Sequence, residues 1–187
     1  YPSKPVRIVV GFVPGGATDI VGRILAEKLS ARMHQPVLVE NRAGASGIIG
    51  ADLVAKSAAD GYTLFFTPSP HVISPVLFAR VPFDPIGDFE PVGLVANLSY
   101  FVIANPRLPA NNLRELIAFA KANPRKLTYG TPGNGTVNHL AMELLKQMAG
   151  IDIVTVHYKG GAPAQTDVIG GHIHLMVASA AQASPFI

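Results

Sequence analysis

The sequence predicts an α/β protein in two lobes, with parallel-rich sheets flanked by helices. Short apolar runs alternate with helical patterns along the chain, which is typical of parallel strands joined by crossover helices. A proline-rich passage over 81–91 interrupts this alternation, which then restarts. The 187 residues are 49% hydrophobic and 14% charged, so the chain can fill one large domain or two small lobes and is not disordered.

The stretch 6–23 establishes the pattern. Residues 6–10 form a continuous apolar run, as a strand buried on both faces does, and a Pro-Gly-Gly turn at 14–16 ends it. Thr18 suits the N-cap of a helix, and Asp19 suits its first turn. A glycine turn that leads into a helix offers free backbone N–H groups, so we expect a place for a small anion here, although most such turns bind nothing.

Two further strands complete the first half. They are predicted at 36–40 and 62–66, with a helix over 48–57 between them. A loop at 67–71 and a short helical piece limited by Pro75 follow. Three strands and two helices in about 60 residues indicate parallel pairing with right-handed crossovers.

The middle of the chain changes character after the proline-rich passage. Two strand-like runs, 92–96 and 100–104, are joined by Asn97-Leu98-Ser99. We interpret this region as the crossing between a first lobe over 1–98 and a second lobe over 99–187. A long surface excursion within one sheet is the alternative.

The second half repeats strand, glycine loop and helix. Strands are predicted at 127–130, 153–157 and 173–178, with glycine loops at 131–136 and 158–161. One helix is predicted to be capped by Asn111 or Asn112 and to end before Asn123-Pro124. A second is predicted over 137–148, with Gly150 as its stop, and a third has Pro163 in its first turn.

Composition excludes several classes of protein. The net charge of +3 is spread thinly, without the basic run that nucleic-acid binding requires. The longest apolar region, 92–104, is too short for the about 20 residues of a membrane span, so no membrane insertion is expected. The absence of cysteine excludes disulfides and thiolate metal sites. The chain begins directly before a strand, as a mature chain without its signal peptide would.

Candidate chemical motifs are weak when taken alone. The loop Gly133-Asn134-Gly135-Thr136 is either a backbone nest for an oxyanion with the Thr136 hydroxyl as a donor, or an ordinary tight turn. A dinucleotide fingerprint is disfavoured because Asn138 stands where the third glycine belongs. Neither a Walker A motif nor a nucleophile elbow occurs.

Histidines do not predict a metal site. His172 and His174 would share one face of a strand, but no third ligand accompanies them, so a surface pair is favoured. His139 is interpreted as a packed or capping residue. We expect no metal, no cofactor and no catalytic residue.

Six motifs in a fixed order together resemble a known family. They are Tyr1–Pro5, Pro14–Asp19, Val39–Gly47, Asp60–Leu64, Tyr129–Thr136 and Tyr158–Gly160. The set resembles the Bug family, the periplasmic solute receptors of tripartite tricarboxylate transporters. This resemblance implies a periplasmic-binding-protein (Venus flytrap) fold that closes on a small organic carboxylate in an interlobe cleft. It also implies a periplasmic location and transporter membrane subunits as partners.

The resemblance implies which residues bind the ligand. In the family, the turns that match 14–19 and 131–136 and the turn ending at His71 line the cleft, and they hold carboxylates through backbone N–H groups, hydroxyls and waters. The predicted ligand-binding residues are Gly16, Ala17, Thr18, Asp19, Ser69, His71, Gly133, Asn134, Gly135, Thr136, Tyr158, Lys159, Gly160, Ala178 and Ser179. We interpret Lys159 as a solvated side chain that adds positive potential, with a direct salt bridge to the ligand as the alternative.

Two departures from the family pattern matter. Many members carry an acidic residue where this chain has Ala178, followed by Ser179, so an amino-acid ligand is disfavoured. Members also continue beyond position 187 with residues that return to the first lobe. We therefore expect a chain whose carboxy-terminal part is missing and that self-associates or binds poorly, unless these residues are part of a longer protein.

The function that this resemblance implies is a solute-binding receptor and not an enzyme. A ligand-sensing module that passes its bound state to a signalling partner is the first alternative. A small-molecule enzyme of nucleotide-binding type is the second.

Overall fold

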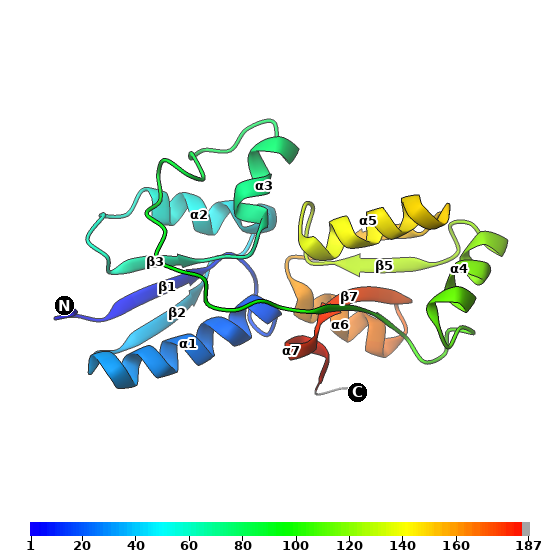
Figure 1. Ribbon diagram of the computed structural model, residues 1–187, viewed down its shortest axis with the longest axis horizontal. Coiled ribbons are helices and arrows are strands. Elements are labelled where there is room, and N and C mark those ends of the chain that lie inside the picture. The colour runs from blue at the N-terminus through cyan, green and yellow to red at the C-terminus, as the bar shows by residue number, and fades with distance from the viewer. Residues whose placement is uncertain (185–187) are drawn as a thin grey trace. The chain divides into compact units, whose positions relative to one another are not determined.

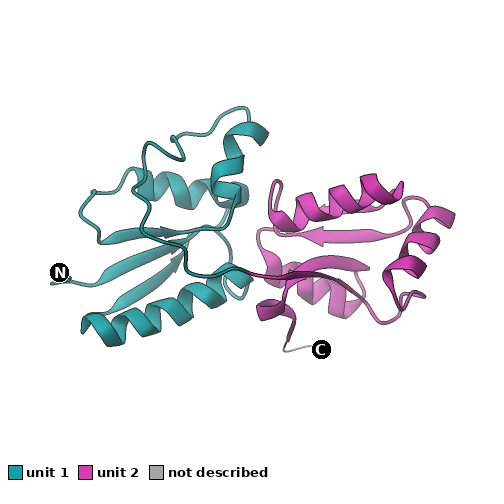
Figure 2. Cartoon of the chain, in the orientation of Figure 1, with its two compact units in different colours: residues 1–97 teal, residues 98–187 magenta. Residues whose placement is uncertain are grey.

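A computed structural model describes residues 1–184 and divides the chain into two compact units, Tyr1–Asn97 and Leu98–Ile187 (Figure 2). Each unit is a sheet with helices packed on it, which confirms the predicted α/β class. The division falls after Asn97, where the sequence predicted it after position 98. That the units act as lobes closing on a ligand stays a prediction.

Unit 1 contains a three-stranded parallel sheet in the order β2-β1-β3. The strands are β1 (Val6–Val10), β2 (Val37–Asn41) and β3 (Thr63–Phe66). The crossover helices α1 (Ala17–Met33) and α2 (Ile48–Ala55) lie on opposite faces of this sheet (Figure 1). The central strand β1 is covered on both sides, which is why its sequence is a continuous apolar run.

Two expectations for unit 1 were wrong. After the short 3₁₀ turn η1 (Ala45–Gly47) and β3, helix α3 (Pro70–Leu77) continues past Pro75. Pro75 cannot donate to the carbonyl of His71, and that carbonyl accepts instead from Ser74 Oγ at 2.9 Å. The run 92–96 is not a strand. Val92 is 84% exposed, so the run has the composition of a strand without a neighbouring strand to pair with among residues 1–184.

Unit 2 contains a four-stranded sheet in the order β4-β7-β5-β6. Its strands are β4 (Tyr100–Ala104), β5 (Thr128–Thr131), β6 (Val154–His157) and β7 (Leu175–Ser179). Strand β4 runs antiparallel to β7, and β5 runs parallel to both β6 and β7. The three parallel strands begin one or two residues later than the sequence predicted.

Helices cover both faces of the sheet in unit 2. They are α4 (Leu113–Ala122), α5 (Val137–Ala149), α6 (Gly161–Gly170) and α7 (Ala180–Ala183). Leu175 and Val177 of β7 belong to a core with residues of α4 and α5, whereas Met176 and Ala178 pack with residues of α6. The predicted start of α4 is confirmed, because the Asn112 side chain accepts the Glu115 N–H at 3.0 Å.

Candidate functional site

In each unit the predicted site residues lie on turns at one edge of the sheet. Residues 16–19 and 69–71 follow the parallel strands β1 and β3 in unit 1. In unit 2, residues 133–136 follow β5, residues 158–160 follow β6, and residues 178–179 are the last two of β7; β5 runs parallel to both β6 and β7. The carboxyl ends of parallel strands are the usual location of ligand sites in α/β sheets.

The turn before α1 leaves the helix N-terminus open. Gly16 is the N-cap, its backbone is extended, and no side chain accepts from the first turn of the helix. The prediction that Thr18 caps α1 was therefore wrong: the helix begins at Ala17, which places Thr18 inside its first turn. Because the first N–H groups of a helix have no partner within the helix, those of Ala17 and Thr18 can donate to an anion.

Asp19 holds this turn from the helix side. The residue is 3% exposed; its Oδ2 accepts from Gly15 N–H at 3.0 Å and from Arg23 Nε at 2.9 Å, and its Oδ1 accepts from Asn41 Nδ2 at 2.8 Å. Burial alone would raise the pKa of Asp19, but the hydrogen bonds from Arg23, Gly15 and Asn41 lower it below its usual value. Asp19 thus positions the turn, and its carboxylate would repel the anion that it was predicted to bind.

Asn41, at the end of β2, joins three segments. Its amide donates to Phe12 O at 3.0 Å as well as to Asp19, and its Oδ1 accepts from Arg23 Nη2 at 2.9 Å. The side chain therefore ties β2 to α1 and to the turn after β1. Neither Asn41 nor Arg23 was among the predicted site residues, although an asparagine at the end of an apolar strand is a signal for such a contact.

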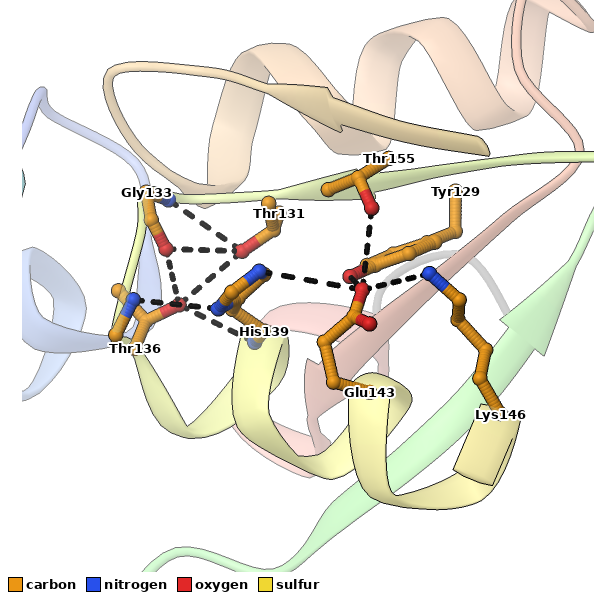
Figure 3. A network of polar contacts seen from close by, with 9 residues as sticks. Tyr129, Thr131, Gly133, Thr136, His139, Glu143, Lys146 and Thr155 are labelled. Atoms are coloured by element: carbon orange, nitrogen blue, oxygen red, sulfur yellow. Dashed lines mark hydrogen bonds and ion pairs between the residues drawn. The ribbon is translucent and has the colours of Figure 1, made fainter. Parts of the chain in front are cut away.

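The loop between β5 and α5 is held by its own side chains (Figure 3). Thr136 is 3% exposed, donates through Oγ1 to Gly133 O at 2.8 Å and accepts the His139 N–H at 3.3 Å, so it caps α5. Thr131 Oγ1 lies 3.1 Å from the Thr136 hydroxyl. For the Thr136 hydroxyl the structure supports the tight-turn alternative, because its proton is already used inside the loop.

His139 connects the loop to the interior of unit 2. Its Nδ1 accepts the Gly135 N–H at 3.3 Å, so the ring proton lies on Nε2, which is 4.0 Å from Glu143 Oε1. Burial lowers the pKa of His139; Glu143 acts in the opposite direction, and His157 and Lys146 add to the decrease. This geometry confirms the interpretation of His139 as a packed residue, and it shows that the Gly135 N–H already has a protein acceptor.

Glu143 is the centre of a polar network behind the loop (Figure 3). Its Oε1 accepts from Tyr129 OH at 2.6 Å, Lys146 Nζ at 2.9 Å and Thr155 Oγ1 at 3.1 Å. Burial alone would raise the pKa of Glu143, but these donors lower it, while burial and the nearby carboxylate raise the pKa of Tyr129. The network joins α5 to β5 and β6, so it fixes the base of the loop.

In the loop between β6 and α6, no side chain caps the following helix, whereas Thr136 caps the helix after the β5–α5 loop. Tyr158 OH donates to Asp167 Oδ2 at 2.5 Å, and burial together with that carboxylate raises the pKa of Tyr158 to about 12, so its proton is not free for a ligand. Lys159 is exposed. Gly160 is the N-cap of α6 without a side-chain acceptor, which leaves the first N–H groups of this helix open.

Ser69 and His71 start α3 in unit 1. Ser69 holds the N-cap position but makes no side-chain cap bond. The His71 ring packs edge-on against Phe89 at a centroid distance of 4.6 Å, stacks on Phe83 at 5.6 Å, and its Nε2 lies 2.9 Å from Pro85 O. Burial lowers the pKa of His71. The structure therefore assigns this ring to an aromatic cluster.

The predicted residues at the end of β7 face the interior. Ala178 and Ser179 are both 0% exposed, and Ser179 Oγ accepts the Gln182 N–H at 3.3 Å. The expectation that His172 and His174 share one face of a strand was wrong, because both precede β7; Nδ1 of His174 accepts the Thr128 N–H at 3.1 Å. No group of three or more potential metal ligands occurs within residues 1–184. In the same part of the chain, no helix has the length and hydropathy that a membrane crossing requires.

The family model and the related sequences that match this chain indicate one family. Residues 21–187 match the TctC family, described as the tripartite tricarboxylate transporter family receptor. Protein BugT of Bordetella pertussis is 40% identical over 173 residues, which cover 91% of this chain and 53% of that protein. A UPF0065 protein from the gbd 5' region of Cupriavidus necator is 37% identical over 100% of this chain and 57% of its own length. The chain spans about half the length of the curated relatives it matches.

Solved structures agree with this result. The periplasmic binding protein BugD superimposes with a TM-score of 0.95 at 36% identity, covering 100% of this chain and 62% of that one. Rpa4515 of R. palustris with adipate gives 0.96 at 36% identity, covering 99% and 62%. MatC of Rhodopseudomonas palustris with bound malate gives 0.90 at 28% identity, covering 99% and 63%. The predicted periplasmic-binding-protein fold is thereby confirmed.

Proposed function

The chain belongs to the tripartite tricarboxylate transporter family of receptors, and from this premise we propose that it binds a small organic carboxylate in the periplasm and delivers it to the membrane subunits of such a transporter. The observation that carries the proposal is the open N-terminus of α1, where no side chain accepts from the first N–H groups. A carboxylate can accept these N–H groups, and the positive end of the helix dipole favours its charge.

The charges around this turn support a ligand held by neutral donors. Arg23 is paired with Asp19 at 2.9 Å, so the turn offers no unpaired cation. A hydrogen bond to a charged group contributes about 1.5–3 kcal/mol, and several such bonds from backbone N–H groups can hold a small acid without a salt bridge. Adipate and malate occur in the related structures named above, and both are dicarboxylates.

We propose that the backbone N–H groups of Ala17 and Thr18 in unit 1 bind a carboxylate, and that the open start of α6 makes a carboxylate-binding turn within unit 2. Asp19 holds the turn before α1 in shape, Thr136 holds the loop before α5, and Lys159 adds positive potential beside α6. That the two units enclose the ligand between them, as the family resemblance implies, stays a prediction. No catalytic residue is proposed.

A calorimetric titration tests the proposal. The protein is titrated with adipate, malate, succinate and citrate, and with adipamide, which has the length of adipate without its charge. We expect saturable binding of at least one acid and none of adipamide, because the open helix termini select a negative charge. Binding of adipamide as tight as that of adipate, or no binding of any acid while the protein shows a cooperative melt, would contradict the proposal.

A further inference from the structure

Gln182 of α7 carries a buried amide that the fold does not use. The residue is 3% exposed, and its Nε2 has no hydrogen-bond partner among residues 1–184. Both backbone groups of Gln182, in contrast, are hydrogen-bonded. The N–H donates to Ser179 Oγ at 3.3 Å, and the carbonyl accepts from Gln165 Nε2 at 3.1 Å. The fold therefore orders this residue while leaving a desolvated donor unpaired, which needs a physical reason.

The amide of Gln182 lies at the start of α6. A Cβ atom placed on Gly161 would be 2.8 Å from both Nε2 and Oε1 of Gln182, which is closer than side chains approach, so any larger residue at this first helical position would displace the amide. Helix α6 has 10 residues, and its N-cap, Gly160, provides no side-chain acceptor. An unpaired side-chain donor and an open helix N-terminus thus occupy the same place, at the carboxyl end of β6.

We propose that Gln182 is a ligand-binding residue whose Nε2 donates to a carboxylate oxygen bound at the N-terminus of α6. The N–H groups of Gly161 and Ala162 donate to the same carboxylate, and all three donors are neutral. This inference rests on the proposed function and extends it to a residue outside the predicted loops. It also explains why position 161 is glycine: a larger residue would displace the amide from the bound anion.

A different role is physically distinct. If the amide were turned over, Oε1 would accept the first N–H groups of α6, and Gln182 would then cap the helix instead of binding a ligand. In that case truncation of the side chain would lower the stability of unit 2 and would not change affinity through a lost ligand contact. Affinity and melting temperature therefore separate the two roles.

Four variants test the inference by calorimetry with adipate and malate, each accompanied by a thermal melt. Gln182→Met keeps the length of the side chain and removes the donor, and Gln182→Glu keeps the shape and adds a negative charge. Gly161→Ala displaces the amide. Gln147→Met is the matched control, because Gln147 is an exposed residue of α5 outside the proposed site.

We expect Gln182→Met to weaken binding by about tenfold, since one hydrogen bond to a charged group is lost. Gln182→Glu should weaken binding by about a hundredfold or more, because it places two carboxylates together. Gly161→Ala should weaken binding, and Gln147→Met should bind as the wild type does. Melting temperatures of the Gln182 variants should stay close to that of the wild type.

Three results would overturn the inference, and they are distinguishable. If the wild type binds none of the acids, the proposed function fails and the inference fails with it. If the wild type binds an acid and both Gln182 variants bind it as tightly as the wild type does, only the inference fails. If Gln182→Met lowers the melting temperature and leaves affinity unchanged, Gln182 is a helix cap.

Discussion

The starts of α1 and α5 are built from similar residues but differ in which backbone groups remain available. Each helix follows a parallel strand and a turn that contains proline and glycine, with a threonine at the helix start: Thr18 inside the first turn of α1 and Thr136 at the N-cap of α5. At α1 no side chain accepts from the first turn of the helix. At α5, Thr136 accepts the His139 N–H, and the His139 ring accepts the Gly135 N–H.

The difference depends on where the polar side chain lies relative to the helix start. In unit 1, Asp19 lies inside the first turn and reaches back to Gly15, so it stabilises the turn without occupying the helix N–H groups. In unit 2, Thr136 precedes the helix and its hydroxyl occupies one of these groups. An acidic residue within the first turn therefore leaves an anion site open, whereas a hydroxyl at the N-cap closes part of it.

The largest expected effect comes from Asp19→Ala. It removes the acceptor of the Gly15 N–H and one of the two acceptors of the Asn41 amide, which keeps its bond to Phe12 O. We expect the free energy of unfolding to fall by about 3 kcal/mol, from two hydrogen bonds to a charged group. Arg23 contributes little to this figure because its side chain is 51% exposed. Chemical denaturation followed by circular dichroism measures the change.

The matched control for that prediction is Glu27→Ala on the same helix. Its side chain is 77% exposed, and its contact with Lys28 is a surface pair. Equal stability of the two variants would show that Asp19 does not hold the turn.

Thr136→Val should have the next largest effect. It removes the cap of α5 and the donor to Gly133 O, and the loss of an N-cap costs about 0.5–2 kcal/mol. Thr136→Ser keeps the hydroxyl and should retain most of the stability. If both variants melt at the wild-type temperature, the loop is not held by this side chain.

A smaller effect is expected from pH, through His139. An unfolded histidine has a pKa of about 6.5, and that of His139 is lower in the folded protein. Between these two pKa values the folded state binds fewer protons than the unfolded state, so its stability falls as the pH decreases through about 6.5. His139→Asn, which keeps an acceptor for Gly135 but does not titrate, should lose less stability between pH 7 and pH 5 when compared by denaturation. His71 contributes a loss of the same sign, so a slope identical to the wild type would assign the whole effect to other groups.

The smallest effect is expected from Thr18→Ala. Because Thr18 is not the cap of α1, its hydroxyl accepts none of the helix N–H groups, and the free energy of unfolding should change by less than about 0.5 kcal/mol. The same thermal melts measure it beside Thr136→Val. A loss as large as that of Thr136→Val would remove the contrast between the two helix starts.

The sequence was sufficient for most of the fold. Strand β1 matches its prediction residue for residue, because an apolar run bounded by proline and glycine is a local signal. The run 92–96 has the same composition but is not a strand, since strand formation also depends on a neighbour that the local sequence does not contain. Pro75 does not end α3 as predicted, because the Ser74 hydroxyl donates to the His71 carbonyl, which a proline at position 75 leaves without its helical donor.

For the candidate site, the sequence located the turns but not the state of their polar groups. Whether a hydroxyl or carboxylate is free depends on contacts across the fold, such as Asn41 with Asp19 and Tyr158 with Asp167. Gln182 was missed for the same reason, because its relation to Gly161 is a close approach between separate helices.

Replacement of Ala17 by proline tests the central claim most directly. Proline suits the first position of a helix, and the extended backbone at Gly16 is compatible with a following proline, so Ala17→Pro removes one open N–H group while the helix is kept. Leu113→Pro makes the same change at the first position of α4, outside the proposed site. We predict that the affinity for the bound carboxylate, measured by calorimetry, falls by about tenfold in Ala17→Pro, is unchanged in Leu113→Pro, and that both variants melt as the wild type does. Unchanged affinity in a stably folded Ala17→Pro would contradict the claim that the open start of α1 binds the ligand.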